Sequence, residues 1–111
     1  LGDMRELGDM AESEHKKISK IATSLADIVI TVGPLWKKYA KLDNQFDNFY
    51  QAGKFLQTFI QKGDVILFKG SQNTIFLEGA VGMCLANPTD AAKLCRRGKF
   101  WEKQREKYEK N

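Results

Sequence analysis

A short apolar run between turn residues constrains the fold of this chain most strongly. Val65 to Phe68 are four consecutive apolar residues, preceded by a Lys-Gly-Asp turn and followed at once by Lys69, Gly70 and Ser71. Such a run is typical of a strand buried on both faces, as in a parallel sheet. The next segment, residues 73–86, has apolar residues at helical spacing. The three residues after the run are therefore expected where a buried strand ends and a helix begins, a crevice that binds ligands in open α/β sheets.

Strands and helices alternate through the rest of the chain. Ile28 to Val32 is a β-branched run that Gly33 ends, and Pro34 suits the first position of a following helix. Gly79 and Gly82 are expected to allow close packing of a helix on the sheet. Further elements are helices over residues 13–25, 34–42, 52–60, 88–97 and 100–110, and a weaker strand over residues 46–50. The sequence thus predicts a three-layer, Rossmann-like α/β sandwich with a mainly parallel sheet, helices on both faces and extra C-terminal helices.

Length and composition describe one ordinary globular domain. The chain has 111 residues, of which 42% are hydrophobic and 29% charged. No apolar run approaches the roughly 20 residues that span a bilayer, and no signal-peptide pattern opens the chain, so we expect a cytoplasmic protein without membrane insertion. Cys84 and Cys95 are expected to be buried or half-buried free thiols. A single histidine and the lack of a Cys-x-x-Cys motif argue against a zinc site.

The net charge of +4 is concentrated near the C-terminal end. Residues 93–110 carry eight basic and three acidic residues, whereas the remainder is close to neutral. This tail also contains Phe100, Trp101 and Tyr108, a mixture found in nucleic-acid-binding segments. The interleaved glutamates and the shared helix face of the aromatic residues instead favour a helix that docks on the domain, because phosphate-driven binding needs a denser cationic surface. We therefore expect no nucleic-acid partner.

The first residues read as the end of a strand. Leu1, Gly2 and Asp3 have no resemblance to a translation start, so we expect a piece of a longer protein that lacks most of its first strand. Residues 1–86 are then the α/β domain, and residues 87–111 are a helical extension that packs on it or projects from it.

Motifs in register resemble one family. The segment LGDMRELG at residues 1–8, followed by His15, resembles the LGDM-x-ELG…H segment of the Mur ligases. ADIVITVG at residues 26–33 resembles the second strand of their C-terminal domain, and residues 63–71 resemble their GD-x-x-L-x-KGS strand-to-helix element. Order and spacing agree over residues 1–86, which is most of the chain. Within the family, the branch that adds D-alanyl-D-alanine is the most similar.

The resemblance implies an ATP-dependent ligation of a carboxylate to an amine in peptidoglycan synthesis. In this family ATP phosphorylates the substrate carboxylate, and the incoming amine attacks the acyl phosphate. The branch implies D-alanyl-D-alanine and a UDP-N-acetylmuramoyl tripeptide as substrates. A central ATPase domain of the same polypeptide binds most of the ATP and Mg²⁺, while the C-terminal domain binds the amine substrate and closes the nucleotide site.

Three departures limit what this chain does alone. It contains no Gly-x-x-x-x-Gly-Lys-Ser/Thr motif, which cradles a triphosphate. The YNANP-type segment at the start of the family's C-terminal domain is absent. Gln72 stands where an arginine is frequent, which puts a carboxylate contact from that position in doubt. We therefore expect no catalytic residue, no metal ligand and no activity in the isolated chain.

The KGS motif supplies the first candidate substrate-binding residues. Lys69 is expected to pair with the carboxylate of the incoming dipeptide, although a lysine at a strand end also suits plain solvent exposure. Gly70 and Ser71 are expected to offer backbone N–H groups and a hydroxyl to an anion. Alternatively, Ser71 only caps the following helix.

The remaining candidates lie near the start of the chain. The loop is expected to orient the attacking amine or contact the nucleotide, or else to be a solvated connection with helix-capping acids. Its candidate residues are Asp3, Met4, Glu6, Leu7 and Gly8. His15 is also a candidate substrate-binding residue, expected to hydrogen-bond either a ligand or this loop, and bracing of the loop is favoured over action as a base. The whole interpretation requires residues 3–8 and 69–71 to meet along one edge of the molecule, where they form an anion-receptive notch.

Two other interpretations stay open. A stand-alone α/β ligand-binding or interaction module would keep the fold without ligation. A related ligase, such as a folylpolyglutamate-type or another Mur enzyme, would keep the chemistry with a different substrate. A P-loop upstream in the parent reading frame would favour the ligase interpretations.

Overall fold

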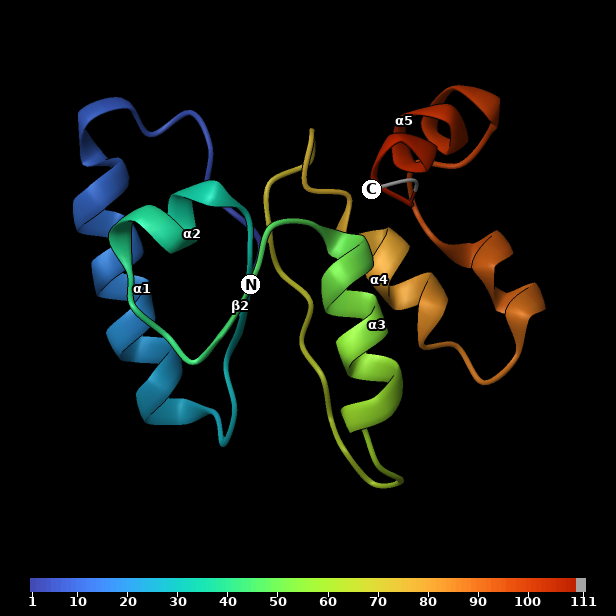
Figure 1. Ribbon diagram of the computed structural model, residues 1–111, viewed down its shortest axis with the longest axis horizontal. Helices are drawn as coiled ribbons and strands as arrows, with labels where there is room; N and C mark the ends of the chain where they lie inside the picture. Colours follow the sequence, from blue (N-terminus) through green and yellow to red (C-terminus); the bar gives the residue numbers. More distant parts are fainter. Residues whose placement is uncertain (110–111) are drawn as a thin grey trace.

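The computed structural model describes residues 1–109 as a mixed α/β chain with several helices and a small parallel sheet. In chain order the elements are η1 (Gly8–Met10), α1 (Ala11–Leu25), β1 (Ile30–Val32), α2 (Pro34–Tyr39), β2 (Asn44–Phe46), α3 (Phe49–Phe59), α4 (Leu77–Met83), η2 (Pro88–Lys93) and α5 (Lys99–Glu109). Figure 1 shows the extended segments in the middle of the molecule, with α1 and α2 on one side and α3 and α4 on the other. Within the described residues, no helix combines the length and apolar character needed to cross a membrane.

Parallel backbone segments form the centre of the molecule. β1 pairs in parallel with β2, with Thr31 opposite Gln45. On its other side, β1 forms a parallel bridge between Val32 and Gly2. The Gly2 nitrogen in turn donates a hydrogen bond to the Lys69 carbonyl oxygen at 2.7 Å. The segments therefore lie in the order β2, β1, the N-terminal residues and the segment that contains Lys69.

Apolar side chains fix α3 and α4 against this centre. The apolar stripe of α3 faces inward because its buried residues recur at helical spacing, among them Phe49, Ala52 and Leu56. One core cluster joins Ala52 to Val32 of β1 and Leu77 of α4. A second cluster joins Phe49 to side chains of α4 and α5. α3 is therefore the element that connects the sheet to the C-terminal helices.

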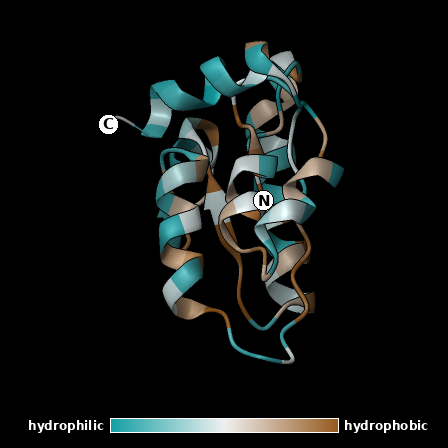
Figure 2. Cartoon of the chain, turned by 90° about the vertical axis from the view of Figure 1, so that its right-hand side faces the viewer, coloured by the Kyte–Doolittle hydropathy of each residue, from teal (hydrophilic) through white to brown (hydrophobic). Residues whose placement is uncertain are grey.

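The apolar run from Val65 to Phe68 is not a buried strand, and the sequence prediction is wrong here. Val65 is 99% exposed and Leu67 is 80% exposed. The run is extended but lies outside the sheet that β1 and β2 form in the described part of the chain. Figure 2 shows these extended segments in hydrophobic colours, in contrast to the mostly hydrophilic α5.

The strand predicted over residues 28–32 is confirmed only from Ile30 onward, because its pairing with β2 begins where Ile30 lies opposite Asn44. The strand predicted over residues 46–50 is largely wrong, since β2 ends where it was expected to begin. There Asn48 starts α3, because its Oδ1 accepts the Gln51 N–H at 3.0 Å and thereby caps the helix. The other predicted helices are confirmed with shifted ends, the one after Pro88 as a 3₁₀ helix. The predicted last helical residue, Lys110, lies outside the described residues.

A buried ion-pair cluster joins the C-terminal helices to α4. Glu78 is 6% exposed, and its carboxylate accepts hydrogen bonds from Arg96 Nε at 3.0 Å and Nη2 at 2.8 Å. Arg105 Nη1 lies 3.3 Å from the same carboxylate and donates to the Arg96 carbonyl oxygen. Trp101 and Tyr108 of α5 pack on the second core cluster. Part of the basic tail is therefore used to dock α5 on the domain.

Two side chains near the C-terminal end are more exposed than expected. Phe100 is 65% exposed and does not share the docked face of Trp101. Cys95 is also exposed, whereas Cys84 is half-buried, and burial raises the pKa of the Cys84 thiol. Both cysteines are free thiols, as predicted.

Gly79→Ala should destabilise the chain, whereas Gly82→Ala in the same helix should not. A Cβ at Gly79 would lie 2.4 Å from Cε2 of Phe49, whose ring is 1% exposed, so this glycine permits contact between helices. A Cβ at Gly82 would meet its nearest atom, Leu94 Cδ1, at 3.7 Å. We expect Gly79→Ala to lower the free energy of unfolding by about 1–3 kcal/mol through overpacking. Gly82→Ala should raise it by up to about 1 kcal/mol through helix propensity.

Urea denaturation of the two variants measures this difference. Equal free energies of unfolding for both variants would contradict the packing of α4 against α3.

Candidate functional site

The loops that follow three parallel segments meet at one edge of the molecule. We call this edge the rim; it consists of residues 3–8, 33–35 and 69–74. The Ser71 nitrogen donates to the Asp3 carbonyl oxygen at 3.1 Å. The Arg5 nitrogen donates to Ser71 Oγ at 2.8 Å. The predicted meeting of the first loop with the KGS motif is therefore confirmed.

Gly70 allows two backbones to pack closely. A Cβ at Gly70 would lie 2.9 Å from the Gly2 Cα, and a Cβ at Gly2 would lie 2.5 Å from Cγ2 of buried Ile75. Neither position can accept a side chain without a shift of its neighbours. The glycine of the KGS motif is thus explained by pairing with the N-terminal residues. Its expected anion contact stays a prediction.

Ser71 does not cap the helix that follows it. Its Oγ accepts the Arg5 N–H, and α4 begins only at Leu77, not at residue 73 as predicted. Before α4 the backbone passes through Thr74 and Phe76, which have left-handed φ values of 72° and 48°. Such a conformation costs a non-glycine residue about 1–2 kcal/mol. The connection is therefore maintained by tertiary contacts, which include the burial of Phe76.

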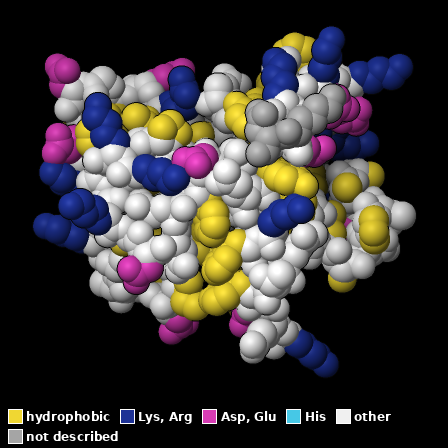
Figure 3. Space-filling view, viewed as in Figure 1, with side chains coloured by type: hydrophobic (Ala, Val, Ile, Leu, Met, Phe, Trp, Pro, Cys, Tyr) yellow, Lys and Arg dark blue, Asp and Glu magenta, His cyan; other side chains and the backbone are white. Residues whose placement is uncertain are grey.

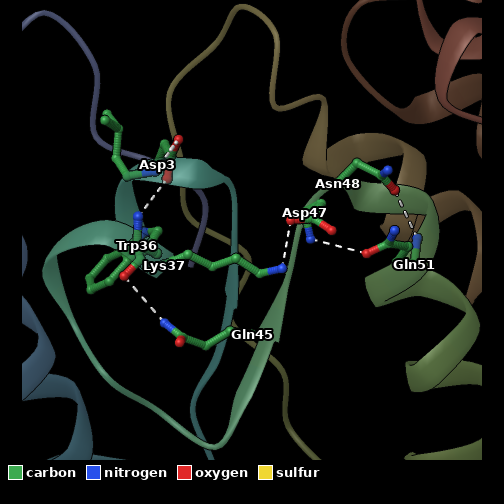
Figure 4. Close-up of polar contacts among 8 residues, drawn as sticks. Asp3, Trp36, Lys37, Gln45, Asp47, Asn48 and Gln51 are labelled. Atoms are coloured by element: carbon green, nitrogen blue, oxygen red, sulfur yellow. Dashed lines mark hydrogen bonds and ion pairs between the residues drawn. The ribbon is translucent and has the colours of Figure 1, made fainter.

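Asp3 is a buried cap on α2 and not a solvated acid. It is 1% exposed, and its carboxylate oxygens accept hydrogen bonds from the Leu35 nitrogen at 3.1 Å and the Trp36 nitrogen at 3.0 Å (Figure 4). A carboxylate is favourable there because the helix N-terminus carries partial positive charge. Gly33, with φ 121°, leaves the necessary space, since a Cβ there would lie 2.4 Å from the Asp3 Cγ. Asp3 thus positions α2 within the rim.

The other end of α2 is capped from β2. Gln45 Nε2 donates to the carbonyl oxygens of Trp36 at 3.2 Å and Ala40 at 2.7 Å. The Ala40 carbonyl oxygen lies beyond the end of the helix and gains a partner in this way, whereas the Trp36 carbonyl oxygen also accepts the Ala40 N–H at 2.9 Å. Figure 4 shows this contact together with the Lys37–Asp47 ion pair, which is exposed and therefore contributes little stability. α2 is thereby fixed at both ends by side chains from the parallel segments.

His15 is buried and braces the rim. It is 0% exposed, and its Nε2 accepts the Met4 N–H at 3.2 Å while its Nδ1 lies 2.6 Å from the Ala11 carbonyl oxygen. These two contacts require the neutral tautomer with the proton on Nδ1. The ring packs edge-on against Trp36 with centroids 4.8 Å apart. A side chain so enclosed can orient the loop but has no access to a substrate, in agreement with the predicted bracing role.

The rest of the first loop has a strained and partly exposed backbone. Glu6 and Gly8 have left-handed φ values of 62° and 53°, and both are exposed. Met4 and Leu7 are half-buried. This conformation strains Glu6 but not Gly8, and strained non-glycine residues cluster at ligand-binding loops. The substrate contacts expected of these four residues stay predictions.

Arg5 and Thr74 are rim residues that sequence reasoning missed. Arg5 Nη1 donates to Thr74 Oγ1 at 2.8 Å, although the two residues lie 69 positions apart. A pattern within either loop carries no signal for such a contact. Arg5 and Lys69 are both exposed, and neither forms an ion pair with another described residue. The rim therefore presents two cationic side chains to the solvent.

The cationic side chains exposed at the rim are chemically suited to an anion. The free N–H groups of a guanidinium and a lysine ammonium suit a carboxylate or a phosphate. By contrast, His15 is enclosed, and both carboxylate oxygens of Asp3 are used by α2. Among residues 1–109, no group of three or more His, Cys, Asp or Glu residues could hold a metal ion.

Comparisons of the chain with protein-family models, with curated proteins and with solved structures gave no match. A functional interpretation therefore depends on the motifs of the sequence and on the geometry of the rim. The confirmed contact between the two motif-bearing loops is the strongest of these observations.

Asp3→Ala should destabilise the chain by about 2–3 kcal/mol. The substitution removes the cap of α2 and leaves two N–H groups without partners, one of them on fully buried Trp36. The matched control is Asp43→Ala, an exposed aspartate before β2, which should change the free energy of unfolding by less than about 0.5 kcal/mol. Chemical denaturation measures both values. A loss below about 0.5 kcal/mol for Asp3→Ala would contradict the capping role.

Proposed function

We propose that this chain is the C-terminal domain of a Mur ligase that joins D-alanyl-D-alanine to a UDP-N-acetylmuramoyl tripeptide. In this reaction an amide bond forms while ATP is cleaved to ADP and phosphate. The chain contributes the site for the amine substrate and closes over the nucleotide held by a central ATPase domain of the same polypeptide. The reaction belongs to peptidoglycan precursor synthesis in the cytoplasm.

The observation that carries this proposal is the contact between the two motif-bearing loops. The LGDM-x-ELG and KGS segments are far apart in the sequence, yet two hydrogen bonds join them. The Ser71 nitrogen donates to the Asp3 carbonyl oxygen, and Ser71 Oγ accepts the Arg5 N–H. Two motifs that form one substrate site must lie next to each other in the structure. A chance sequence similarity to the family would not require this contact.

Individual rim residues receive distinct roles. Lys69 pairs with the free carboxylate of the dipeptide, and Arg5 supplies the guanidinium that Gln72 cannot provide. Ser71 and the N–H groups of its loop complete the anion site. Asp3 and His15 are positioning residues, because their polar atoms are used within the chain. The loop with Met4, Glu6, Leu7 and Gly8 borders the dipeptide.

ATP and Mg²⁺ are assigned to the central domain. The sequence has no triphosphate-cradling motif, and the described residues offer no cluster of metal ligands. The described residues by themselves therefore offer no complete site for either ATP or Mg²⁺. What the chain itself supplies is binding and orientation of the dipeptide at the rim.

The proposal extends to the fold. Helices on both sides of the parallel segments support a three-layer, Rossmann-like sandwich. In this interpretation the N-terminal residues and the segment that contains Lys69 belong to the sheet together with β1 and β2. Residues 1–86 form its α/β domain, and residues 87–111 form the C-terminal extension.

Lys69→Ala should raise the KM for D-alanyl-D-alanine about tenfold in the polypeptide that joins this chain to its ATPase domain. The loss of one charge-assisted contact, about 1.5 kcal/mol, corresponds to this factor. The KM for ATP should stay within about twofold, because the nucleotide is held elsewhere. Steady-state kinetics with each substrate varied in turn measures the two constants. Arg5→Gln should act in the same direction.

The control variant is Lys62→Ala, an exposed lysine in the turn before the apolar run. It should leave both KM values unchanged. An unchanged dipeptide KM in Lys69→Ala would remove Lys69 from the substrate site. Turnover by the 111-residue chain alone would contradict the division of roles between the two domains.

A stand-alone ligand-binding or interaction module is the second candidate. It is favoured by one observation, the use of both Asp3 carboxylate oxygens as a structural cap. Such a module would bind an anion at the rim without any partner domain. Tight binding of D-alanyl-D-alanine or inorganic phosphate by the isolated chain, at micromolar concentration, would favour it over the ligase domain.

A further inference from the structure

The loop before α4 contains two residues in an unfavourable backbone conformation. Thr74 has φ 72° and Phe76 has φ 48°. For a β-branched or bulky residue a positive φ is a genuine outlier, which persists only where the surrounding contacts enforce it. Figure 1 shows this loop between the N-terminal residues and the C-terminal helices. Contacts on both sides of the loop therefore determine its shape.

Ile75 and Phe76 hold the loop through two different core clusters. Ile75 is 5% exposed and belongs to the first cluster, together with Val32 and Leu77. Phe76 is also 5% exposed, but it belongs to the second cluster. A change of φ at Phe76 would move one of these two side chains out of its cluster. Burial of both side chains therefore fixes the backbone between them.

α5 supplies part of the environment of Phe76. The ring centroids of Trp101 and Tyr108 each lie 6.1 Å from that of Phe76. An ion pair between α5 and α4 holds the helix in this position. Figure 3 shows Lys and Arg side chains around the outside of this region at upper right, with apolar side chains beneath it. The neighbouring Phe100 is 65% exposed and does not belong to the cluster, so only one face of α5 fixes the loop.

Thr74 faces the rim instead of the core. It is exposed, and its Oγ1 accepts a hydrogen bond from Arg5 Nη1 at 2.8 Å. Ser71 of the same loop accepts the backbone N–H of Arg5, also at 2.8 Å. The loop thus holds both the backbone and the guanidinium of Arg5. A guanidinium carries five N–H donors, so this contact leaves most of them free for a ligand.

A fixed arginine binds an anion at a lower entropic cost than a mobile one. An exposed arginine side chain samples many rotamers, and a ligand that orders it loses affinity for that reason. The contact with Thr74 restricts Arg5 before any ligand arrives. A planar guanidinium held in this way suits the two oxygens of a carboxylate.

We propose that Thr74 and Phe76 are positioning residues of the rim, and that α5 holds them in place. Docking of α5 fixes Phe76, the left-handed loop then sets Thr74 Oγ1 against Arg5, and Arg5 is oriented in advance to bind a carboxylate. The C-terminal extension thus acts on the substrate site without contact with the substrate. Because the carboxylate is that of the dipeptide, this role of the two residues rests on the proposed function.

NMR relaxation of the Arg5 Nε–H group in the 111-residue chain tests the positioning. Thr74→Val removes the acceptor, while Trp101→Leu and Tyr108→Leu each remove an aromatic contact with Phe76. Each of the three should lower the order parameter of this group about twofold, because a freed arginine moves on the ps–ns timescale. The controls are Thr74→Ser, which keeps the hydroxyl, and Phe100→Leu on the exposed face of α5. Both controls should leave the order parameter unchanged.

Protection of the α3 amides from exchange reports that each variant is folded. An unchanged order parameter in folded Trp101→Leu and Tyr108→Leu would overturn the role of α5. The same result in Thr74→Val would overturn the role of Thr74. A loss in Phe100→Leu as large as in Trp101→Leu would also overturn the proposal, since it would not depend on the docked face.

Steady-state kinetics of the polypeptide that joins this chain to its ATPase domain gives the second test. Thr74→Val and Trp101→Leu should each raise the KM for D-alanyl-D-alanine about threefold, the effect of one weakened hydrogen bond, with the KM for ATP unchanged. Thr74→Ser should restore the original value. The double variant should also show about a threefold increase, because both changes act through the same hydrogen bond. An increase of about ninefold would mean independent effects and would overturn the proposal.

The two tests separate these positioning roles from the proposed function. Failure of the joined polypeptide to ligate D-alanyl-D-alanine would contradict the proposed function, and the order parameters would still decide how Arg5 is held. Ligation with an unchanged dipeptide KM in Thr74→Val would overturn the positioning roles alone.

Discussion

The pairing of residues 1–3 with a segment on each side is the interaction on which the rest of the structure depends. The Asp3 nitrogen donates a hydrogen bond to the Val32 carbonyl oxygen of β1, and the Gly2 nitrogen donates one to the Lys69 carbonyl oxygen on the opposite side. The same three residues carry the carboxylate that caps α2. Without them, β1 and the KGS loop would have no common neighbour, and the two cationic side chains of the rim would separate. The proposed anion site is thus a product of backbone pairing more than of any local motif.

Elements with strong local signals could be predicted from the sequence. Gly33 and Pro34 mark the end of β1 and the start of α2, as expected from their backbone preferences. The helical periodicity of α1 and α3 predicts both helices because it requires only neighbours within the helix. The apolar stripe of α3 is buried as expected, whereas Ile21 and Leu25 in the stripe of α1 are exposed. Alternation of strands and helices also places the loops after the strands at one edge, which is why the contact between residues 3–8 and 69–71 could be expected.

Features that depend on distant neighbours could not be read from local patterns. The run from Val65 to Phe68 has the composition of a buried strand but lacks a paired segment beside it. The contact of Arg5 with Thr74, and the left-handed backbone at Phe76, follow from the way two loops pack. The role of Asp3 is similar, since a buried cap and a substrate-binding acid have the same sequence signal. Only its two hydrogen bonds to α2 distinguish them.

Scalar couplings across hydrogen bonds, measured by NMR on the ¹⁵N,¹³C-labelled chain, test the central pairing most directly. We predict one coupling between the Gly2 nitrogen and the Lys69 carbonyl carbon, and another between the Ser71 nitrogen and the Asp3 carbonyl carbon. These couplings require the two loops to be joined, whatever the rim binds. Their absence, in a chain whose α3 amides are protected from exchange, would contradict the rim and remove the physical basis of the proposed function.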